Sequence, residues 1–290
     1  MLVWLNGRVL PARAARVPAL DRGLLHGDGV YDTWRTYDGR PFAVAAHVRR
    51  LAAAARVLRL PPPEPAVRWE QRSRLLVRRN ALADAAVRLT ITRGAAGDAI
   101  VPAARAHPTL LLTVRRLPAD LARARTTGIG VVLLPFPRDA GPPWGGLKLV
   151  GHASAVVGRM RAARRGAGEA LYVTAADDVT EATTANLFIV ERDGVVTPPL
   201  SAGVLPGVTR SLVLRLARAR GLAAREQSIS GSRLREAAEV FLTASTAEVM
   251  PVIRVDGRRV GGGRPGTITR LLQDAYATHV RTTLGRGRSA

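Results

Sequence analysis

Cysteine is absent from this 290-residue chain, and lysine occurs only once. Without cysteine there is no disulfide, no thiolate metal ligand and no cysteine nucleophile, so we expect a cytoplasmic location. Aromatic residues make up only 4% of the chain. No apolar run reaches the roughly 18 residues that a transmembrane helix needs, so we expect no membrane partner.

Acidic residues are also scarce: 22 of them face 44 basic ones, which gives a formal net charge of +22. Such an excess is typical of nucleic-acid-binding proteins, and we keep a basic, non-catalytic protein of that kind as the alternative from a different class. However, the arginines are scattered, without interleaved aromatic residues and without a zinc-finger or RRM signature. We therefore expect no specific nucleic-acid partner.

The single lysine is Lys148, so the other 43 of the 44 basic residues are arginine. Arginine stays protonated and cannot act as a nucleophile, whereas a desolvated lysine can lose its proton and form a Schiff base with a carbonyl. Codon bias alone would leave a surviving lysine on a solvated helix face. Lys148 instead lies beside apolar residues in a segment rich in glycine and proline, which favours carbonyl–amine chemistry.

The order of expected elements predicts a mixed α/β (α+β) fold with two domains. Residues 1–117 form a small N-terminal domain, 118–130 an interdomain linker and 131–290 a larger C-terminal domain. Strands and helices alternate without a regular βαβ repeat, and neither a GxGxxG fingerprint nor a Walker loop occurs. The main expected strands are 1–5, 8–10, 29–37, 87–92, 109–114, 129–134, 170–174, 186–190 and 239–243, and the main helices are 47–58, 66–82, 153–165, 209–220 and 267–279.

Two segments of the larger domain have the chemistry of anion-binding turns. In the first, Gly207 precedes a helix whose opening amides, those of Val208 and Thr209, point N–H groups at an anion. Ordinary capping by Thr209 explains the same residues. In the second, Ser245 and Thr246 follow an apolar strand and supply hydroxyls. The alternative is that these hydroxyls only form hydrogen bonds with the local backbone.

A single carboxylate, Glu181, lies in a small polar stretch that enters an apolar strand, where it can hold a protonated ring nitrogen. A solvent-facing turn residue is the alternative. Arg50 follows His47 on an expected helix, and composition alone gives it no special role. His26 and His47 are interpreted as structural, and the five histidines of the chain have no metal-site spacing.

Together these motifs resemble the class IV aminotransferases, the fold-type IV pyridoxal-phosphate enzymes, over nearly the whole chain. That family includes branched-chain and D-amino acid aminotransferases and aminodeoxychorismate lyases. The matching segments are 21–23 with 27–31, the "H…RL" helix at 47–51, the lysine at 148, the "E…NLF" stretch at 180–188, and the phosphate turns at 205–210 and 239–248.

The resemblance implies a homodimer that binds pyridoxal 5'-phosphate and exchanges an amino group between an amino acid and a 2-oxo acid. Lys148 would hold the cofactor as a Schiff base and shuttle the proton, and Glu181 would face the pyridine nitrogen. The phosphate would bind Arg50, the amides of Val208 and Thr209, and the hydroxyls of Thr209, Ser245 and Thr246. Tyr31 and Thr33 are expected to contact substrate.

The reaction within the family is less determined. Residues 256–270 resemble the C-terminal signature of branched-chain enzymes, so a branched-chain-like L-amino acid is the leading substrate. Ala153 stands where many such enzymes have a tyrosine, and Asp32 replaces a customary glutamate. Aminodeoxychorismate lyase, which uses the same cofactor and lysine and forms 4-aminobenzoate, is the first alternative. Thr33 resembles a lyase threonine, although threonine is also common at that place in aminotransferases.

A D-amino acid or amine transaminase is the second alternative. Tyr31 matches a residue of the D-amino acid enzymes. The loop after Gly94 offers Asp98 and Ile100 in place of the arginine and histidine that bind the substrate carboxylate there.

Overall fold

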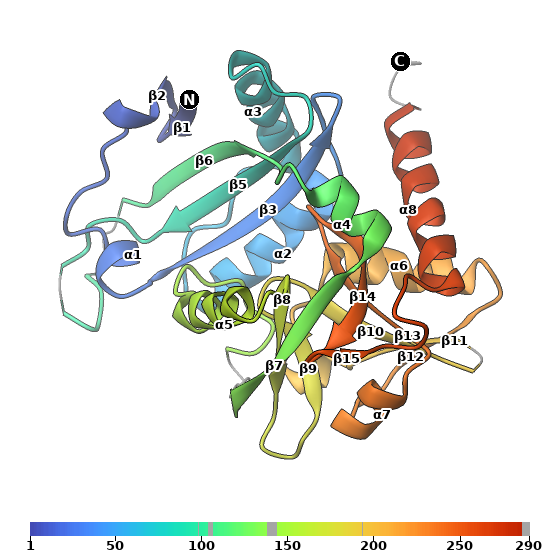
Figure 1. Ribbon diagram of the computed structural model, residues 1–290. Coiled ribbons are helices and arrows are strands. Elements are labelled where there is room, and N and C mark those ends of the chain that lie inside the picture. The colour runs from blue at the N-terminus through green and yellow to red at the C-terminus, as the bar shows by residue number, and fades with distance from the viewer. Residues whose placement is uncertain (98, 104–106, 138–143, 193, 286–290) are drawn as a thin grey trace. The chain divides into compact units, whose positions relative to one another are not determined.

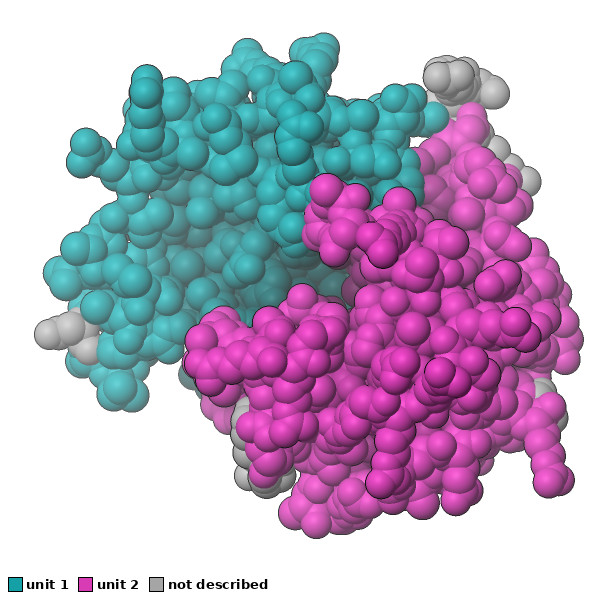
Figure 2. All heavy atoms as spheres, in the orientation of Figure 1, with its two compact units in different colours: residues 1–117, 147–152 teal, residues 118–146, 153–290 magenta. Residues whose placement is uncertain are grey.

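The computed structural model describes residues 1–97, 99–103, 107–137, 144–192 and 194–285. The chain forms two compact units, shown in separate colours in Figure 2. Unit 1 contains residues 1–117 and 147–152, and unit 2 contains residues 118–146 and 153–290. Asp98, in the loop considered for carboxylate binding, lies outside the described residues.

This division differs from the predicted one in two respects. The segment 118–130 is not a bare linker, because it contains helix α4 (Leu121–Thr127) and the first residues of strand β7 (Ile129–Pro137). The segment 147–152, with Lys148, belongs to unit 1 and not to the C-terminal domain. Leu147 and Leu149 explain this assignment, since both pack against the hydrophobic core of unit 1.

Unit 1 is built on a six-stranded sheet with the strand order β2-β1-β6-β5-β3-β4, in which every neighbouring pair is antiparallel (Figure 1). Its elements are β1 (Leu2–Leu5), β2 (Arg8–Pro11), α1 (Arg22–Leu25), β3 (Gly29–Tyr37), β4 (Arg40–Pro41), α2 (Val44–Val57), α3 (Ala66–Arg79), β5 (Ala85–Thr92) and β6 (Thr109–Arg116). Helix α2 starts at Val44, three residues before the start predicted at His47. The residue before it, Ala43, is the N-cap and has a left-handed φ of 56°.

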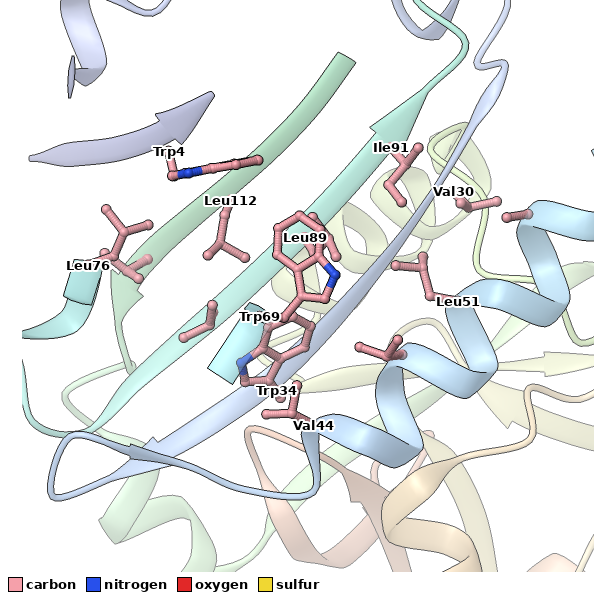
Figure 3. Close-up of a cluster of buried hydrophobic side chains, with 14 of the residues drawn as sticks. Trp4, Val30, Trp34, Val44, Leu51, Trp69, Leu76, Leu89, Ile91 and Leu112 are labelled. Atoms are coloured by element: carbon pink, nitrogen blue, oxygen red, sulfur yellow. The ribbon is translucent and has the colours of Figure 1, made fainter. Parts of the chain in front are cut away.

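The core of unit 1 lies between this sheet and helices α2 and α3, as Figure 3 shows. Strand β3 contributes Val30 and Trp34, which are four positions apart and therefore point to the same face of the strand. Trp34 is fully buried, and its indole N–H donates to Ser73 Oγ at 3.1 Å, so no polar group is stranded. The other face of β3 is thereby left for Tyr31 and Thr33.

Unit 2 contains a nine-stranded sheet with the order β12-β11-β10-β13-β14-β7-β8-β9, and β15 pairs with β14. Besides α4 and β7, its elements are α5 (Ala153–Arg164), β8 (Glu169–Val173), β9 (Val179–Ala182), β10 (Asn186–Glu191), β11 (Gly194–Thr197), α6 (Val208–Arg218), β12 (Ala223–Glu226), α7 (Gly231–Glu236), β13 (Glu239–Ala244), β14 (Glu248–Val255), β15 (Arg258–Arg259) and α8 (Thr267–Gly285). Strand β9 pairs with β10 as well as β8, so this part of the sheet closes on itself.

The glycine-rich stretch before α8 has a structural role. Glu239, the first residue of β13, accepts hydrogen bonds from the amides of Ile268 and Thr269 and from the Thr269 hydroxyl, at 3.0, 2.7 and 2.7 Å. A side chain at Gly266 would collide with this carboxylate. Glu239 therefore caps α8 from a distant strand, where a negative charge also suits the helix dipole.

We expect Glu239→Ala to lower the free energy of unfolding by about 1–3 kcal/mol, because charged hydrogen bonds to amides at a helix start are lost. Denaturant unfolding followed by circular dichroism measures this change. Glu236→Ala, at an exposed glutamate three residues away, is the matched control. Equal stability of the two variants would contradict the capping role.

Candidate active site

Lys148 lies on a short segment that runs alongside β3. The Tyr31 amide donates to the Lys148 carbonyl at 2.9 Å, and the Val150 amide donates to the Gly29 carbonyl at 3.0 Å. Leu147 and Leu149 point into the core, so extended backbone directs the intervening Lys148 side chain to the opposite face. There its Nζ lies 4.7 Å from the centroid of the Tyr31 ring.

The face of the sheet that carries Tyr31 is polar. Thr33 shares this face, because it lies two residues along β3, and the register places Arg88 of β5 directly opposite Thr33. The Arg88 guanidinium carbon lies 3.7 Å from the Tyr31 ring centroid. Burial lowers the pKa of Arg88, and none of the described carboxylates pairs with it. Arg88 is thus a half-buried cation beside the lysine.

His152 completes this group. Its Nε2 lies 2.7 Å from the Tyr31 hydroxyl, and the two rings meet edge to face with centroids 5.5 Å apart. Burial raises the pKa of Tyr31, which keeps the hydroxyl neutral near pH 7. Tyr31 is therefore in contact with three polar side chains, those of Lys148, Arg88 and His152.

Arg50 is held by an aspartate on the core side of β3. Its Nε and one terminal nitrogen donate to the two carboxylate oxygens of Asp32 at 2.9 and 2.7 Å, and His47 Nδ1 lies 2.9 Å from Asp32 Oδ1. Burial alone would raise the pKa of Asp32, but attraction to Arg50 and His47 outweighs it and holds that pKa well below its usual range. The bidentate pair fixes the guanidinium plane. The phosphate-binding role of Arg50 stays a prediction.

In unit 2, Glu181 lies where β9 pairs with β10 and closes the sheet. Its direct partner in the register is Asn186, whose side-chain amide donates to Glu181 Oε2 at 3.2 Å. The Leu205 amide donates to the same oxygen at 3.0 Å, and Asn186 also donates to the Leu205 carbonyl at 2.8 Å. The carboxylate is 4% exposed, so it is not the solvent-facing turn residue of the alternative interpretation.

Helix α6 begins immediately after this contact. Its N-cap is Gly207 and no side chain caps it, so Thr209 does not perform the ordinary capping role. A Cβ at Gly207 would lie 2.0 Å from Asn186 Oδ1, which explains the glycine although its φ of −64° suits any residue. The amides of Val208 and Thr209 are in the first turn, where helices bind anions.

The second predicted turn connects β13 to β14. Ser245 and Thr246 are half-buried in it. Thr243, just before the turn, is the direct partner of Asn186 across β10 and β13, so Glu181, Asn186 and Thr243 form a row across three strands. Among the residues that the structure describes, the buried Thr243 Oγ1 has no hydrogen-bond partner. An unmatched buried hydroxyl is typical of a ligand site.

The donor sets of the two units fit pyridoxal 5'-phosphate chemically. Unit 1 supplies a primary amine for an aldehyde and a fixed guanidinium, and unit 2 supplies a buried carboxylate, an uncapped helix start and an unmatched hydroxyl. An amine, a carboxylate for a protonated ring and anion-binding amides are the groups that this cofactor requires. Each unit thus carries groups that an enzyme of carbonyl–amine chemistry needs.

Comparison with known proteins shows the family to which this enzyme belongs. A model of the amino-transferase class IV family matches residues 29–255. The branched-chain-amino-acid aminotransferase of Escherichia coli is 30% identical over 282 residues, which cover 94% of this chain and 91% of that protein. Its crystal structure superimposes with a TM-score of 0.90 over 96% of this chain and 94% of that chain.

Two further relatives show the breadth of the family. The D-alanine aminotransferase of Bacillus licheniformis is 29% identical over 286 residues, which cover 97% of each chain. A hypothetical aminotransferase from Mycobacterium tuberculosis, in its PLP-bound form, has a TM-score of 0.83 and 27% identity over 96% of this chain and 100% of that chain.

The chain belongs to the class IV aminotransferases. It is therefore an aminotransferase that uses pyridoxal 5'-phosphate, and the predicted fold type IV is confirmed. The alternative of a nucleic-acid-binding protein without catalysis is wrong. No helix in the described part of the chain is long and apolar enough to cross a membrane.

The predicted site residues fall in both units. Tyr31, Thr33, Arg50 and Lys148 are in unit 1, and Glu181, Val208, Thr209, Ser245 and Thr246 are in unit 2. No individual role was predicted for Arg88, His152, Asn186 or Thr243. For Arg88 a signal existed, because strand alternation in β5 directs it away from its core neighbours Val87 and Leu89.

Proposed function

We propose that the chain transfers the amino group of a branched-chain L-amino acid to a 2-oxo acid. The observation that supports this substrate is the match to the Escherichia coli branched-chain enzyme over nearly the full length of both chains, in sequence and in fold. The resemblance of residues 256–270 to the branched-chain signature adds less support, because Gly266 is explained by the Glu239 cap on α8.

Each of the described site residues has a proposed role that follows from its chemistry. When bound, pyridoxal 5'-phosphate supplies an aldehyde that condenses with amines and a ring that withdraws electrons from the substrate carbon. Lys148 would hold the cofactor, and its Nζ would accept the proton from the substrate α-carbon. Glu181, held in place by Asn186 and the Leu205 amide, would face the ring nitrogen and favour its protonated form. Arg50 and the first turn of α6 would bind the phosphate.

Arg88 and Thr33 bind a carboxylate of the substrate. Arg88 is a partly desolvated cation, one strand away from the residue that contacts Lys148, and a substrate carboxylate would give it the ion pair that no described side chain supplies. Thr33 lies directly across from it and adds a hydroxyl. This assignment does not depend on the loop after Gly94, whose Ile100 is 80% exposed.

We expect Arg88→Leu to raise KM for at least one of the two substrates by about 10- to 100-fold, since a charged hydrogen-bonded pair with the carboxylate is lost. Steady-state kinetics with each substrate varied in turn measures the change. Arg116→Leu, at an exposed arginine on β6, is the matched control. Unchanged KM values for both substrates in Arg88→Leu would contradict carboxylate binding.

A half-reaction screen tests the substrate. Purified protein with bound cofactor is mixed with L-leucine, L-isoleucine, L-valine, D-alanine or a simple amine, and the conversion of the cofactor to its amine form is followed by absorbance. We expect the branched-chain L-amino acids to react fastest. A faster reaction with D-alanine or the amine would support those transaminases instead. Pyruvate release from aminodeoxychorismate, with no half-reaction, would identify a lyase.

We also propose that the active form is a homodimer. Apolar side chains of helix α5 support an interface between copies of the chain, because Val156, Val157 and Met160 are each more than half exposed. Light scattering of the purified protein tests this, and a monomer at micromolar concentration would contradict it. The cytoplasmic location stays a prediction.

A further inference from the structure

The segment that carries Lys148 also carries His152, and both residues contact Tyr31. Two backbone hydrogen bonds fix this segment against β3, one at Lys148 and one at Val150. Gly27, with a left-handed φ of +65°, approaches Gly151 so closely that a Cβ at Gly27 would lie 3.3 Å from the Gly151 Cα. The positions of Lys148 and His152 relative to β3 are therefore set by the backbone.

Tyr31 makes two contacts with this segment, one through its hydroxyl and one through its ring. Its hydroxyl is hydrogen-bonded to His152 Nε2 at 2.7 Å, and its ring centroid lies 4.7 Å from Lys148 Nζ. The face of an aromatic ring is negative and attracts a cation, whereas the ring edge does not. The rotation of the Tyr31 ring thus decides whether the lysine nitrogen is stabilised in its charged form.

We propose that His152 is a positioning residue for the reaction: by its hydrogen bond to the Tyr31 hydroxyl it fixes the ring face toward Lys148 and favours the protonated form of that nitrogen. The inference rests on Lys148 being the cofactor lysine, but it is independent of which amino acid is the substrate. His152 stands next to Ala153, the residue that replaces the family's tyrosine.

Other charges also act on this pair, and the test must separate them from His152. Arg88 lies over the same ring at 3.7 Å and disfavours a second cation, while Asp32 and Arg50 act from the core side of β3 with opposite signs. The groups that face Tyr31 and Lys148 from the neighbouring elements are Asp32 of β3, His47 and Arg50 of α2, Arg88 of β5, and His152. Asp32, His47, Arg50 and Arg88 are all retained in the variants that remove only this hydrogen bond.

The experiment is a pH titration of the visible absorbance of the enzyme with cofactor bound, without any substrate. His152→Phe keeps an aromatic ring and removes the ring nitrogen of the hydrogen bond, and Tyr31→Phe removes the hydroxyl. We expect the absorbance midpoint to fall by about 0.5–1 pH unit in each variant. We expect the double variant to shift no further than either single one, because both substitutions break the same bond.

Two more variants complete the design. His152→Gln retains a polar atom that can reach the hydroxyl, so it should recover at least half of the shift, and His107→Phe at an exposed histidine should titrate as the wild type does. An unchanged midpoint in His152→Phe, or additive shifts in the double variant, would overturn the proposal. A lower unfolding temperature without a shifted midpoint would show a merely structural role and overturn it too. An unexpected substrate preference would leave all these titrations unaffected.

Discussion

We expect Lys148→Arg to remove the visible absorbance of the protein mixed with cofactor and to lower transamination by about 10⁴-fold or more. The substitution keeps the positive charge, but a guanidinium neither loses its proton near pH 7 nor forms a Schiff base. Absorbance spectra after addition of pyridoxal 5'-phosphate and single-turnover kinetics with the preferred amino acid measure both effects.

Because the chain has a single lysine, moving it to another position tests whether the position of the amine matters. In the double variant Lys148→Arg, Arg49→Lys, the chain again has one lysine and the same net charge, but the amine lies on the exposed side of α2. We expect this variant to stay inactive. Borohydride reduction of the wild-type enzyme should attach the cofactor at residue 148, which mass spectrometry detects. Recovery of absorbance with lysine at 49 would contradict a positional requirement.

We expect Glu181→Gln to lower kcat by about 10²- to 10³-fold, with a smaller change in KM. Glutamine has nearly the same shape, but it lacks the charge that, in the proposed role, keeps the pyridine nitrogen protonated, so the ring would withdraw fewer electrons when the substrate carbon loses its proton. The rate of the amino-acid half-reaction at saturating substrate measures this loss.

The control for Glu181→Gln is Glu236→Gln, which removes the same charge at an exposed position of the same unit. It should keep the wild-type rate. Glu181→Asp keeps the charge on a shorter side chain and should recover part of the activity. A wild-type half-reaction rate in Glu181→Gln would show that the carboxylate serves only to hold Asn186 and Leu205.

Pairing across the sheets explains why several residues were not identified from sequence. Thr243 and Asn186 are 57 positions apart, and they become direct partners only because β13 pairs with β10 in this register. Arg88 is one arginine among 43. Strand alternation alone directs it away from the core, but only the pairing of β5 with β3 shows that it lies opposite Thr33 and against the Tyr31 ring. Such long-range pairings depend on the packing of the whole sheet, not on the residues nearby.

The sequence by itself determined the chemistry of this protein and the order of its parts. A single lysine among arginines predicted the nucleophile, and the motifs around residues 50, 181, 207 and 245 indicated the family and its cofactor, which the comparisons confirm. Only the tertiary structure decided which residues surround that lysine. Leu147 and Leu149 draw the segment into unit 1, and the alternation of extended backbone then places Lys148 against Tyr31, His152 and Arg88. The physical reason is that the burial of apolar side chains distant in sequence positions the amine.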